Sequence, residues 1–319
     1  MMSILKIEDL QPFLIQGKRK VSGLYRTPRS GMMLKVMGDN ISAYDVVIGE
    51  IDGKGREINK ISNHWKKSLA GIIDSDLVSD NNEKIADLFG YHRVSKELNG
   101  KISVVNVAEV IPIEAIVRGY ISGSLYEEYK KSNGNERLIN GLWIPAGMKE
   151  SEMFPVPIFT PTTKASVGHD EPIQYEGMVT IISDWLNNHK HIYGHTGRSL
   201  AQMIRATSIA LYSTAHNIAI RNEIIIPDTK FEYGMIYNCP VGWELILIDE
   251  VLTPDSSRFW PLKDYRIGES QPSLDKQFFR DWLIKEAKWD KVSSPPEIPE
   301  SVKKETIRRY RKISKILTS

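Results

Sequence analysis

The segment Asp228-Thr-Lys-Phe-Glu-Tyr-Gly234 places two carboxylates and an ammonium at alternate positions. In an extended strand alternate side chains share one face, so Asp228, Lys230 and Glu232 would project together. Two carboxylates and an ammonium on one face suit magnesium and phosphate. The solvated face of an amphipathic strand would show the same alternation, so the spacing alone leaves both interpretations open.

A second acidic segment follows an aliphatic strand that ends at Asp249 and Glu250. Acidic side chains at the end of a buried strand are costly unless they are paired or bind a cation. Asp249 beside Glu232 would form a hard-oxygen site for magnesium on nucleotide phosphates. Arg258, in the turn that follows, could hold a carboxylate or a phosphate through two parallel hydrogen bonds. A capped turn with a surface salt bridge is a plausible alternative for Asp255, and less so for Asp249.

A short basic segment with Gly17, Lys18 and Lys20 precedes a strand that is expected to end at Tyr25. A glycine lets backbone N–H groups approach a phosphate, and lysines add mobile positive charge. The segment is not a Walker A loop, because the second glycine and the Lys-Ser/Thr pair are absent. Considered alone, it is more typical of an exposed basic turn.

Two other segments are candidates for binding. Arg118 stands at the end of an expected strand and is followed by a Gly/Ser loop that contains Ser124. This arrangement resembles an anion cradle, although Gly/Ser loops are commonly plain turns. The polar stretch 159–171, which includes His169 and Asp170, has neither helical nor strand periodicity. Such a loop is often a binding loop, with solvent exposure as the default interpretation.

Two patterns suggest chemistry that the rest of the sequence does not support. His189, His191 and His195 are spaced so that they could bind zinc, but no fourth ligand is evident and a solvated loop is favoured. The basic segment 302–317 invites a nucleic-acid interpretation. Its apolar positions Val302 and Leu317 instead predict a helix that packs on the body with a charged outer face.

Length and composition bound the class of protein. The chain has 319 residues with 42 Lys and Arg against 40 Asp and Glu, a formal net charge of +2, which provides no global field to attract nucleic acid or a membrane. The length is typical of about two domains. Cys239 is the only cysteine, which excludes an intramolecular disulfide and favours a reducing compartment. No apolar run approaches the ~20 residues of a membrane span, and the N-terminus is not typical of a signal peptide. We expect a soluble, cytoplasmic protein.

The elements that must position these side chains can be predicted coarsely. Apolar residues at helical spacing predict helices over 58–69 and 200–220, and two more over 276–287 and 302–317, the last pair separated by a proline-rich linker. Short β-branched and aliphatic runs predict the strands 32–37, 46–51, 102–107, 111–117, 224–227, 230–233 and 243–249. Strands that cluster and are joined by short turns favour an α+β fold over a doubly wound parallel sheet.

Taken together, these segments resemble the SAICAR synthetase (phosphoribosylaminoimidazole-succinocarboxamide synthase) family of purine biosynthesis. The resemblance runs in family order from about residue 10 to about residue 287. The block from Asp249 to Trp260 is highly specific, and the stretch GESQPSLDKQFFRDWL points to the longer, yeast-like branch. The matching stretches are Gly17-Lys18-x-Lys20, NISAYD, VRGYISGS, PIFTPTTKASVGHDE, PDTKFEYG, LIDEVLTPDSSRFW and GESQPSLDKQFFRDWL.

Membership implies a two-domain fold, with a kinase-like N-terminal antiparallel sheet in 1–110, a larger α+β domain in 111–319, and ATP in the cleft between them. It also implies a ligase reaction in which ATP, L-aspartate and carboxyaminoimidazole ribonucleotide give SAICAR, ADP and phosphate through an acyl phosphate. A carboxylate must become an acyl phosphate before an amine can displace it, so the site must hold phosphates and neutralise charge. The partners are then small molecules, with neither nucleic acid nor membrane among them.

The resemblance also assigns roles to individual residues. Gly17, Lys18 and Lys20 belong to the ATP-phosphate loop, and Val105 to Val107 match the adenine-binding hinge. Lys230 faces the phosphates, and Glu232 and Asp249 match magnesium ligands. The ribonucleotide is held at Arg118, Ser124 and Arg258, while His169 and Asp170 match the loop near the reacting carboxylate. The catalytic set implied in this way is Asp170, Asp228, Lys230 and Arg258.

Two departures from the family pattern leave alternatives open. Tyr25 lies eight residues after Gly17 instead of six, which we interpret as a two-residue insertion in the phosphate loop. Asn40 stands where the yeast-like branch typically has arginine, which removes a candidate anion contact. The alternatives are the same fold and ATP chemistry with a different amine or carboxylate, or a non-catalytic nucleotide-binding homologue. The second is disfavoured by the presence together of Asp228, Lys230, Glu232, Asp249 and Arg258.

Overall fold

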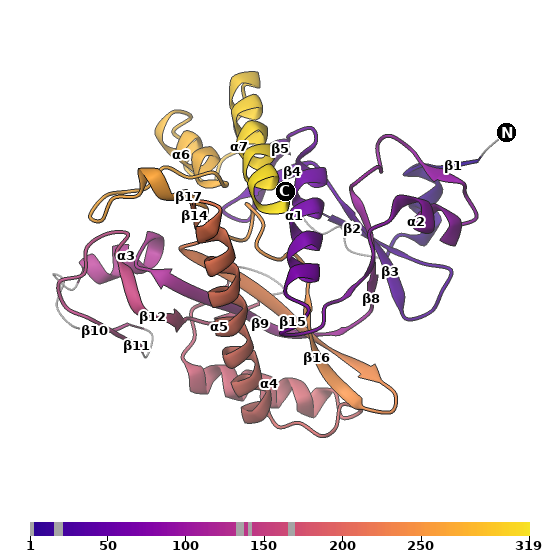
Figure 1. Ribbon diagram of the computed structural model, residues 1–319, viewed down its shortest axis with the longest axis horizontal. Coiled ribbons are helices and arrows are strands. Elements are labelled where there is room, and N and C mark those ends of the chain that lie inside the picture. Colours follow the sequence, from indigo (N-terminus) through magenta and orange to yellow (C-terminus); the bar gives the residue numbers. More distant parts are fainter. Residues whose placement is uncertain (1–2, 16–21, 132–136, 140–141, 165–169) are drawn as a thin grey trace.

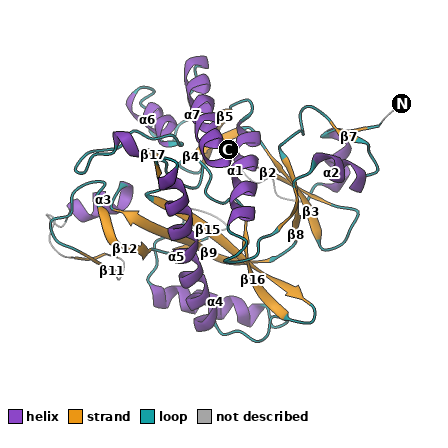
Figure 2. Cartoon of the chain, viewed as in Figure 1, coloured by secondary structure: helices purple, strands orange, loops and turns teal. Residues whose placement is uncertain are grey.

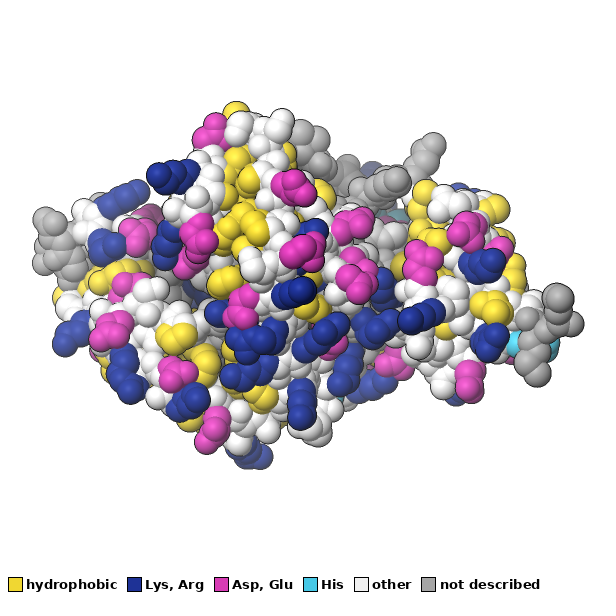
Figure 3. Space-filling view, turned by 90° about the horizontal axis from the view of Figure 1, so that it is seen from above, with side chains coloured by type: hydrophobic (Ala, Val, Ile, Leu, Met, Phe, Trp, Pro, Cys, Tyr) yellow, Lys and Arg dark blue, Asp and Glu magenta, His cyan; other side chains and the backbone are white. Residues whose placement is uncertain are grey.

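The computed structural model describes residues 3–15, 22–131, 137–139, 142–164 and 170–319 (Figure 1). Helices and mostly antiparallel sheets are mixed along the chain, which confirms the predicted α+β class. In the described part of the chain, no helix is both long and apolar enough to cross a membrane. On the face drawn in Figure 3, basic side chains have acidic ones among them, in keeping with the net charge of +2.

A four-stranded antiparallel sheet forms the N-terminal region. Its strands stand in the order β2 (Ser22–Arg26), β3 (Met32–Met37), β8 (Ile102–Asn106) and β6 (Leu77–Ser79). Leu34 and Val104 from its central strands pack with Ile85 of α2 (Asn82–Leu88) in a small core. The elements at the edge of this core are β1 (Ile4–Leu5), the 3₁₀ helix η1 (Glu8–Phe13) and β7 (Arg93–Val94).

A larger antiparallel sheet carries the candidate site. Its order is β12 (Met153–Phe159), β9 (Glu109–Tyr120), β15 (Asp228–Asn238) and β16 (Gly242–Ile248), with β13 (Thr162–Thr163) also paired to β9. The side chains of β15 alternate between the two faces of the sheet, although its register with β9 shifts between Glu232 and Gly234. Phe231, Tyr233 and Met235 are buried in the main core, while Lys230 and Glu232 point to the opposite face, as the spacing predicts.

Helices α4 (Tyr175–Asn188) and α5 (Gly197–Arg221) cover the apolar face of this sheet (Figure 2). Helix α5 begins three residues earlier than the apolar stripe indicates, because Thr196 and Ser199 form a reciprocal capping box. Helix α1 (Lys54–Ser68) inserts Ile61 and Trp65 into the same core. The largest hydrophobic core therefore joins segments from both halves of the chain.

The C-terminal helices close one side of the molecule. Helix α6 (Gln277–Lys285) packs on the hairpin β4 (Asn40–Ala43)–β5 (Val46–Glu50) through Phe279 and Trp282. Helix α7 (Glu300–Thr318) contacts α1 and α6 and buries Val302 and Leu317, as its apolar positions predict. The remaining elements are α3 (Gly123–Lys130), β10 (Arg137–Ile139), β11 (Leu142–Ile144), β14 (Ile224–Ile225), β17 (Trp260–Pro261) and the 3₁₀ helix η2 (Leu262–Asp264).

We propose residues 1–110 and 111–319 as the two structural units. The chain leaves the N-terminal sheet at Asn106, the last residue of β8, and enters the larger sheet at Glu109, the first of β9. Helix α1 and the β4–β5 hairpin belong to the first unit by sequence and pack against the second. These packed elements bring the two sheets together around the cleft described next.

Candidate active site

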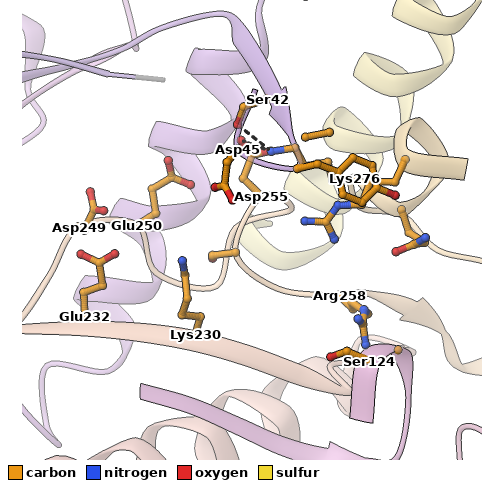
Figure 4. A pocket seen from close by; sticks show the side chains of 16 residues that line it. Ser42, Asp45, Ser124, Lys230, Glu232, Asp249, Glu250, Asp255, Arg258 and Lys276 are labelled. Carbon is orange, nitrogen blue, oxygen red and sulfur yellow. Dashed lines mark hydrogen bonds and ion pairs between the residues drawn. The ribbon is translucent and has the colours of Figure 1, made fainter. Parts of the chain in front are cut away.

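An open cleft of about 520 Å³ lies where the two halves of the chain meet. Its walls are the β4–β5 turn, the start of α3, strand β15, the segment 249–258 and the start of α6. Figure 4 shows Glu232 and Asp249 side by side at one end, with Lys230 next to them and Arg258 with Ser124 toward the other end. An adjoining pocket of about 220 Å³ continues past Arg258.

Strand register explains why the two predicted metal ligands meet. Glu232 of β15 is paired with Ile248 of β16, so Asp249 follows directly beside it. Asp249 has a left-handed backbone conformation with φ of +62°, which turns the chain out of the strand at this point. Non-glycine residues in this region are uncommon and are often found at functional sites.

The two predicted metal ligands at this end of the cleft each form an ion pair with a lysine. Glu232 pairs with Lys164 and Asp249 pairs with Lys35. Burial acts to lower the pKa of Lys35, but the neighbouring carboxylates, Asp249 first among them, raise it overall. Lys35 therefore stays charged, and the acidic end of the cleft is electrostatically balanced by ammonium groups drawn from distant parts of the chain.

Lys230 lies between the two ends of the cleft and forms an ion pair with Glu114 of β9. Burial raises the pKa of Glu114, and Lys230 opposes that shift only in part. Burial acts to lower the pKa of Lys230, but Glu114, Glu232 and Asp170 raise it overall. The structure thus places an ammonium that stays protonated at the centre of the cleft, with Asp170 close enough to act on it electrostatically.

Two guanidinium groups share one carboxylate in the adjoining pocket. Nη1 of Arg118 and Nη1 of Arg258 each lie 3.1 Å from Oδ2 of Asp228. Nη1 of Arg258 also donates a hydrogen bond to Oγ of Ser122 at 2.8 Å. Asp228 and Arg118 are cross-strand partners of β15 and β9, so the sheet itself fixes this spacing. A paired guanidinium set of this kind suits a phosphate or a carboxylate.

Gly123 is required beside Arg258. It has φ of +58°, and a Cβ atom there would lie 2.2 Å from Nη2 of Arg258. Only glycine allows both this backbone conformation and the close approach of the guanidinium. Ser124, which follows, lines both pockets.

Val105 and Val107 lie at the end of β8 and just after it, and their role as an adenine-binding hinge stays a prediction. Val105 lines a small pocket of about 50 Å³ between the two sheets, together with Lys35 and Asp249. The amide of Val107 already donates to the carbonyl of Gly31 at 2.9 Å. Gly17, Lys18, Lys20 and His169 lie outside the described residues, and their predicted roles stay predictions.

Three cleft residues were not singled out from the sequence. Asp45 lies in the β4–β5 turn with φ of +66°, and Lys276 and Arg280 are one turn apart at the start of α6. Lys276 and Arg280 sit in a stretch that resembles the family, where the four-residue spacing could have identified them. Asp45 ends NISAYD, another stretch that resembles the family, although a turn before a strand commonly contains aspartate.

Two of the three histidines lie close together: the ring centroids of His189 and His191 are 5.9 Å apart, and both rings lie near Glu109. Nε2 of His195 lies instead 2.9 Å from the backbone carbonyl oxygen of Trp243. His189 stacks on Trp185 with ring centroids 4.6 Å apart, and His191 meets Trp243 edge-on at 5.3 Å. Within the residues that the structure describes, no three His, Cys, Asp or Glu side chains are arranged to hold a metal ion. The zinc interpretation gains no support, whereas magnesium commonly uses only one or two protein carboxylates.

Comparisons with known proteins agree with this geometry. The profile of the SAICAR synthetase family matches residues 13–296. The phosphoribosylaminoimidazole-succinocarboxamide synthase of Desulforapulum autotrophicum is 39% identical over 303 residues, covering 94% of this chain and 93% of that protein. The structure of SAICAR synthase from Saccharomyces cerevisiae in complex with SAICAR is 36% identical, covers 97% of this chain and 96% of its own, and has a TM-score of 0.80.

A more distant structure, a SAICAR synthetase in complex with ADP, shares the fold at 20% identity with a TM-score of 0.62, covering 96% of this chain and 97% of its own. The family profile spans most of the chain, and the yeast enzyme aligns over nearly all of it. The chain therefore belongs to the SAICAR synthetase family of purine biosynthesis, in its longer yeast-like branch.

Proposed function

We propose that this protein is an ATP-dependent ligase that joins L-aspartate to carboxyaminoimidazole ribonucleotide and produces SAICAR, ADP and phosphate. The observation that carries the proposal is one cleft with carboxylates at one end, a guanidinium pair at the other, and Lys230 between them (Figure 4). The related structures in complex with SAICAR and with ADP support the proposal, since both molecules are products of this reaction.

The reaction needs two displacements. In the first, a carboxylate oxygen of the ribonucleotide attacks the γ-phosphorus of ATP, a new O–P bond forms, and the bond to ADP breaks. In the second, the aspartate nitrogen attacks the acyl carbon and a C–N bond forms. The bond between that carbon and the bridging oxygen breaks, phosphate leaves with this oxygen, and the nitrogen loses a proton. Such phosphoryl transfer depends chiefly on positioning and on neutralising charge.

The residues of the cleft match these needs. Lys230 would face the transferred phosphoryl group, and Arg118, Ser124 and Arg258 would hold the ribonucleotide. Asp228 would keep both guanidinium groups in place, since it contacts each of them at 3.1 Å.

The remaining assignments follow the resemblance. We assign Asp170, together with His169, to the loop near the reacting carboxylate, because Asp170 lies within electrostatic reach of Lys230. The adenine would lie near Val105 and Val107, and Gly17, Lys18 and Lys20 would form the phosphate loop.

Magnesium fits the donor set at the acidic end. Glu232 and Asp249 provide hard carboxylate oxygens on adjacent strands, and magnesium is commonly held by two such groups together with substrate phosphates. When bound there, the ion would neutralise part of the negative charge of the ATP phosphates. Lys35 and Lys164 form ion pairs with the same two carboxylates and add positive charge beside the proposed phosphate position.

The test is ADP release by the purified protein with ATP, magnesium and the ribonucleotide, against a panel of amino acids. We expect turnover with L-aspartate and identification of SAICAR by mass spectrometry. Turnover with another amine alone would show that the amine was assigned wrongly. No turnover with any amine, despite ATP binding, would favour a non-catalytic nucleotide-binding role.

A further inference from the structure

Helix α7 lies beyond residues 13–296, the part of the chain that the family profile matches, and no site residue was predicted in it. Figure 1 shows it beside α1 and α6. Its buried residues follow helical spacing at positions 302, 306, 310, 313, 314 and 317. Five of these side chains are ordinary core or small polar groups. The sixth, Tyr310, brings a hydroxyl group to the wall of the active site.

Tyr310 is fully buried, and its ring packs among Met37 and Ile58. Its hydroxyl donates a hydrogen bond to Oδ1 of Asp255 at 2.6 Å. A hydrogen bond to an ionised carboxylate is stronger than one between neutral groups. Because the ring is held by apolar contacts on a long helix, the hydroxyl is a fixed donor.

The other oxygen of Asp255 faces two ammonium groups. Oδ2 lies 2.8 Å from Nζ of Lys54 and 3.6 Å from Nζ of Lys276. The side chain of Lys54 is 0% exposed, and those of Asp255 and Lys276 are each 8% exposed. The two oxygens thus have different partners, and a rotation of the carboxylate would separate Oδ2 from the lysines.

Lys276 and Asp255 both line the cleft, where Lys276 stands beside Arg280. Its Nζ also lies 3.5 Å from Oγ of Ser42, within a weak hydrogen bond that Figure 4 marks. An ammonium at this point faces the space proposed for anionic substrates. Its position depends on where Oδ2 of Asp255 points.

We propose that Tyr310 is a positioning residue of the active site: by holding Oδ1 of Asp255, it directs Oδ2 toward Lys276 and so places the ammonium of Lys276 in the cleft. The kinetic consequence rests on the proposed function, whereas the link among the three side chains does not. The C-terminal helix then serves catalysis as well as packing.

The first test removes only the hydroxyl. We expect Tyr310→Phe to lower kcat/KM for the ribonucleotide about tenfold with L-aspartate and ATP saturating. The matched control is Tyr233→Phe, which removes an equally buried hydroxyl from a neutral partner, Ser208, at 2.8 Å. This control should stay within twofold of the wild type. Equal losses in both variants, or wild-type activity in Tyr310→Phe, would overturn the proposal.

A double-mutant cycle separates positioning from general packing. If Tyr310 acts through Asp255, Tyr310→Phe should change kcat/KM by less than twofold in an Asp255→Asn background. The same loss in both backgrounds would show that the hydroxyl acts by another route.

A second measurement needs no turnover. The side chains that act on the pKa of Lys276 are Asp255, Lys54, Arg280 and Glu250, and burial lowers that pKa to about 8. Loss of the attraction from Asp255 should lower it further. In an NMR titration of ¹³C-labelled lysines, with the Lys276 signal assigned through Lys276→Arg, we expect a lower midpoint in Tyr310→Phe than in the wild type.

This titration distinguishes the two proposals. A shifted midpoint without any ligase activity would support the positioning role and contradict the proposed function. An unchanged midpoint in a folded Tyr310→Phe protein would contradict the positioning role. If that variant does not fold, Asp255→Asn with intact α7 tests the same contact, and an unchanged Lys276 midpoint there would also overturn the proposal.

Discussion

Replacing Arg258 by lysine tests the guanidinium end of the cleft. Nη1 of Arg258 contacts both Ser122 and Asp228, at 2.8 and 3.1 Å, which leaves the rest of the planar group for a ligand. Lysine keeps the positive charge but has a single nitrogen. It cannot keep its position between Ser122 and Asp228 and also present two parallel donors. We expect weaker binding of the ribonucleotide with little change for ATP.

The size of the effect follows from the contacts. Hydrogen bonds to charged groups contribute about 1.5–3 kcal/mol each. Since lysine retains the charge, the loss should fall in the lower half of that range. About 1.5–2 kcal/mol corresponds to roughly a 10- to 30-fold rise in the apparent KM for the ribonucleotide.

The assay measures ADP release while each substrate is varied with the others saturating, in the wild type, Arg258→Lys and a control. Arg198→Lys is the matched control, because the guanidinium of Arg198 also makes two polar contacts. Its Nη1 and Nη2 donate hydrogen bonds to the carboxylate of Glu176, at 3.1 and 2.7 Å, on an exposed surface. In this control, the apparent KM for each substrate should stay within twofold of the wild-type value. A rise in the KM for ATP in Arg258→Lys, with the ribonucleotide constant unchanged, would refute the assignment.

Three further results are expected. Glu232→Gln and Asp249→Asn should each lower kcat at least 100-fold, which is the usual loss when a main electrostatic group of an active site is removed. Circular dichroism should show that the fold is retained. Wild-type rates would show that these carboxylates have only a structural role. Gly123→Ala should lower kcat/KM more than tenfold, since its Cβ would meet Arg258, and cost about 1–2 kcal/mol in urea unfolding. Burial acts to raise the pKa of Asp255, but nearby lysines lower it overall. The ionised carboxylate therefore stabilises the fold at every pH above its unfolded pKa of about 3.8, and this stabilisation is lost as the pH falls from there through the lower pKa of the folded state. Asp255→Asn should therefore cost roughly 3 kcal/mol at pH 7, with the difference from wild type shrinking below pH 4; a constant difference would contradict the ionised state.

The polar face of β15 could be predicted because its pattern is local. Phe231 and Tyr233 alternate with Lys230 and Glu232, and a period of two has one structural meaning once one face is buried. The helix stripes 58–69 and 200–220 were equally informative, because each is long and places most of its apolar side chains in the main core.

The pairing of charges could not be predicted in the same way. Lys35 and Asp249 are 214 residues apart, and Lys230 and Glu114 are 116 apart. Such contacts depend on which distant strands pair and in what register, and the local pattern of a single sequence does not reveal that pairing. Helix boundaries were displaced for local reasons, as at the capping box that starts α5.

The buried charges of the cleft have a common origin in this long-range pairing. Asp228 is held by arginines from β9 and from the segment after β16, and Asp255 is held by side chains from α1, α6 and α7. A buried charge without its partner is strongly destabilising, and a partially formed site would contain several such unpaired charges. The cleft therefore assembles only when the sheets and the C-terminal helices are all in place, and this explains why a helix outside the family profile can determine the geometry of the site.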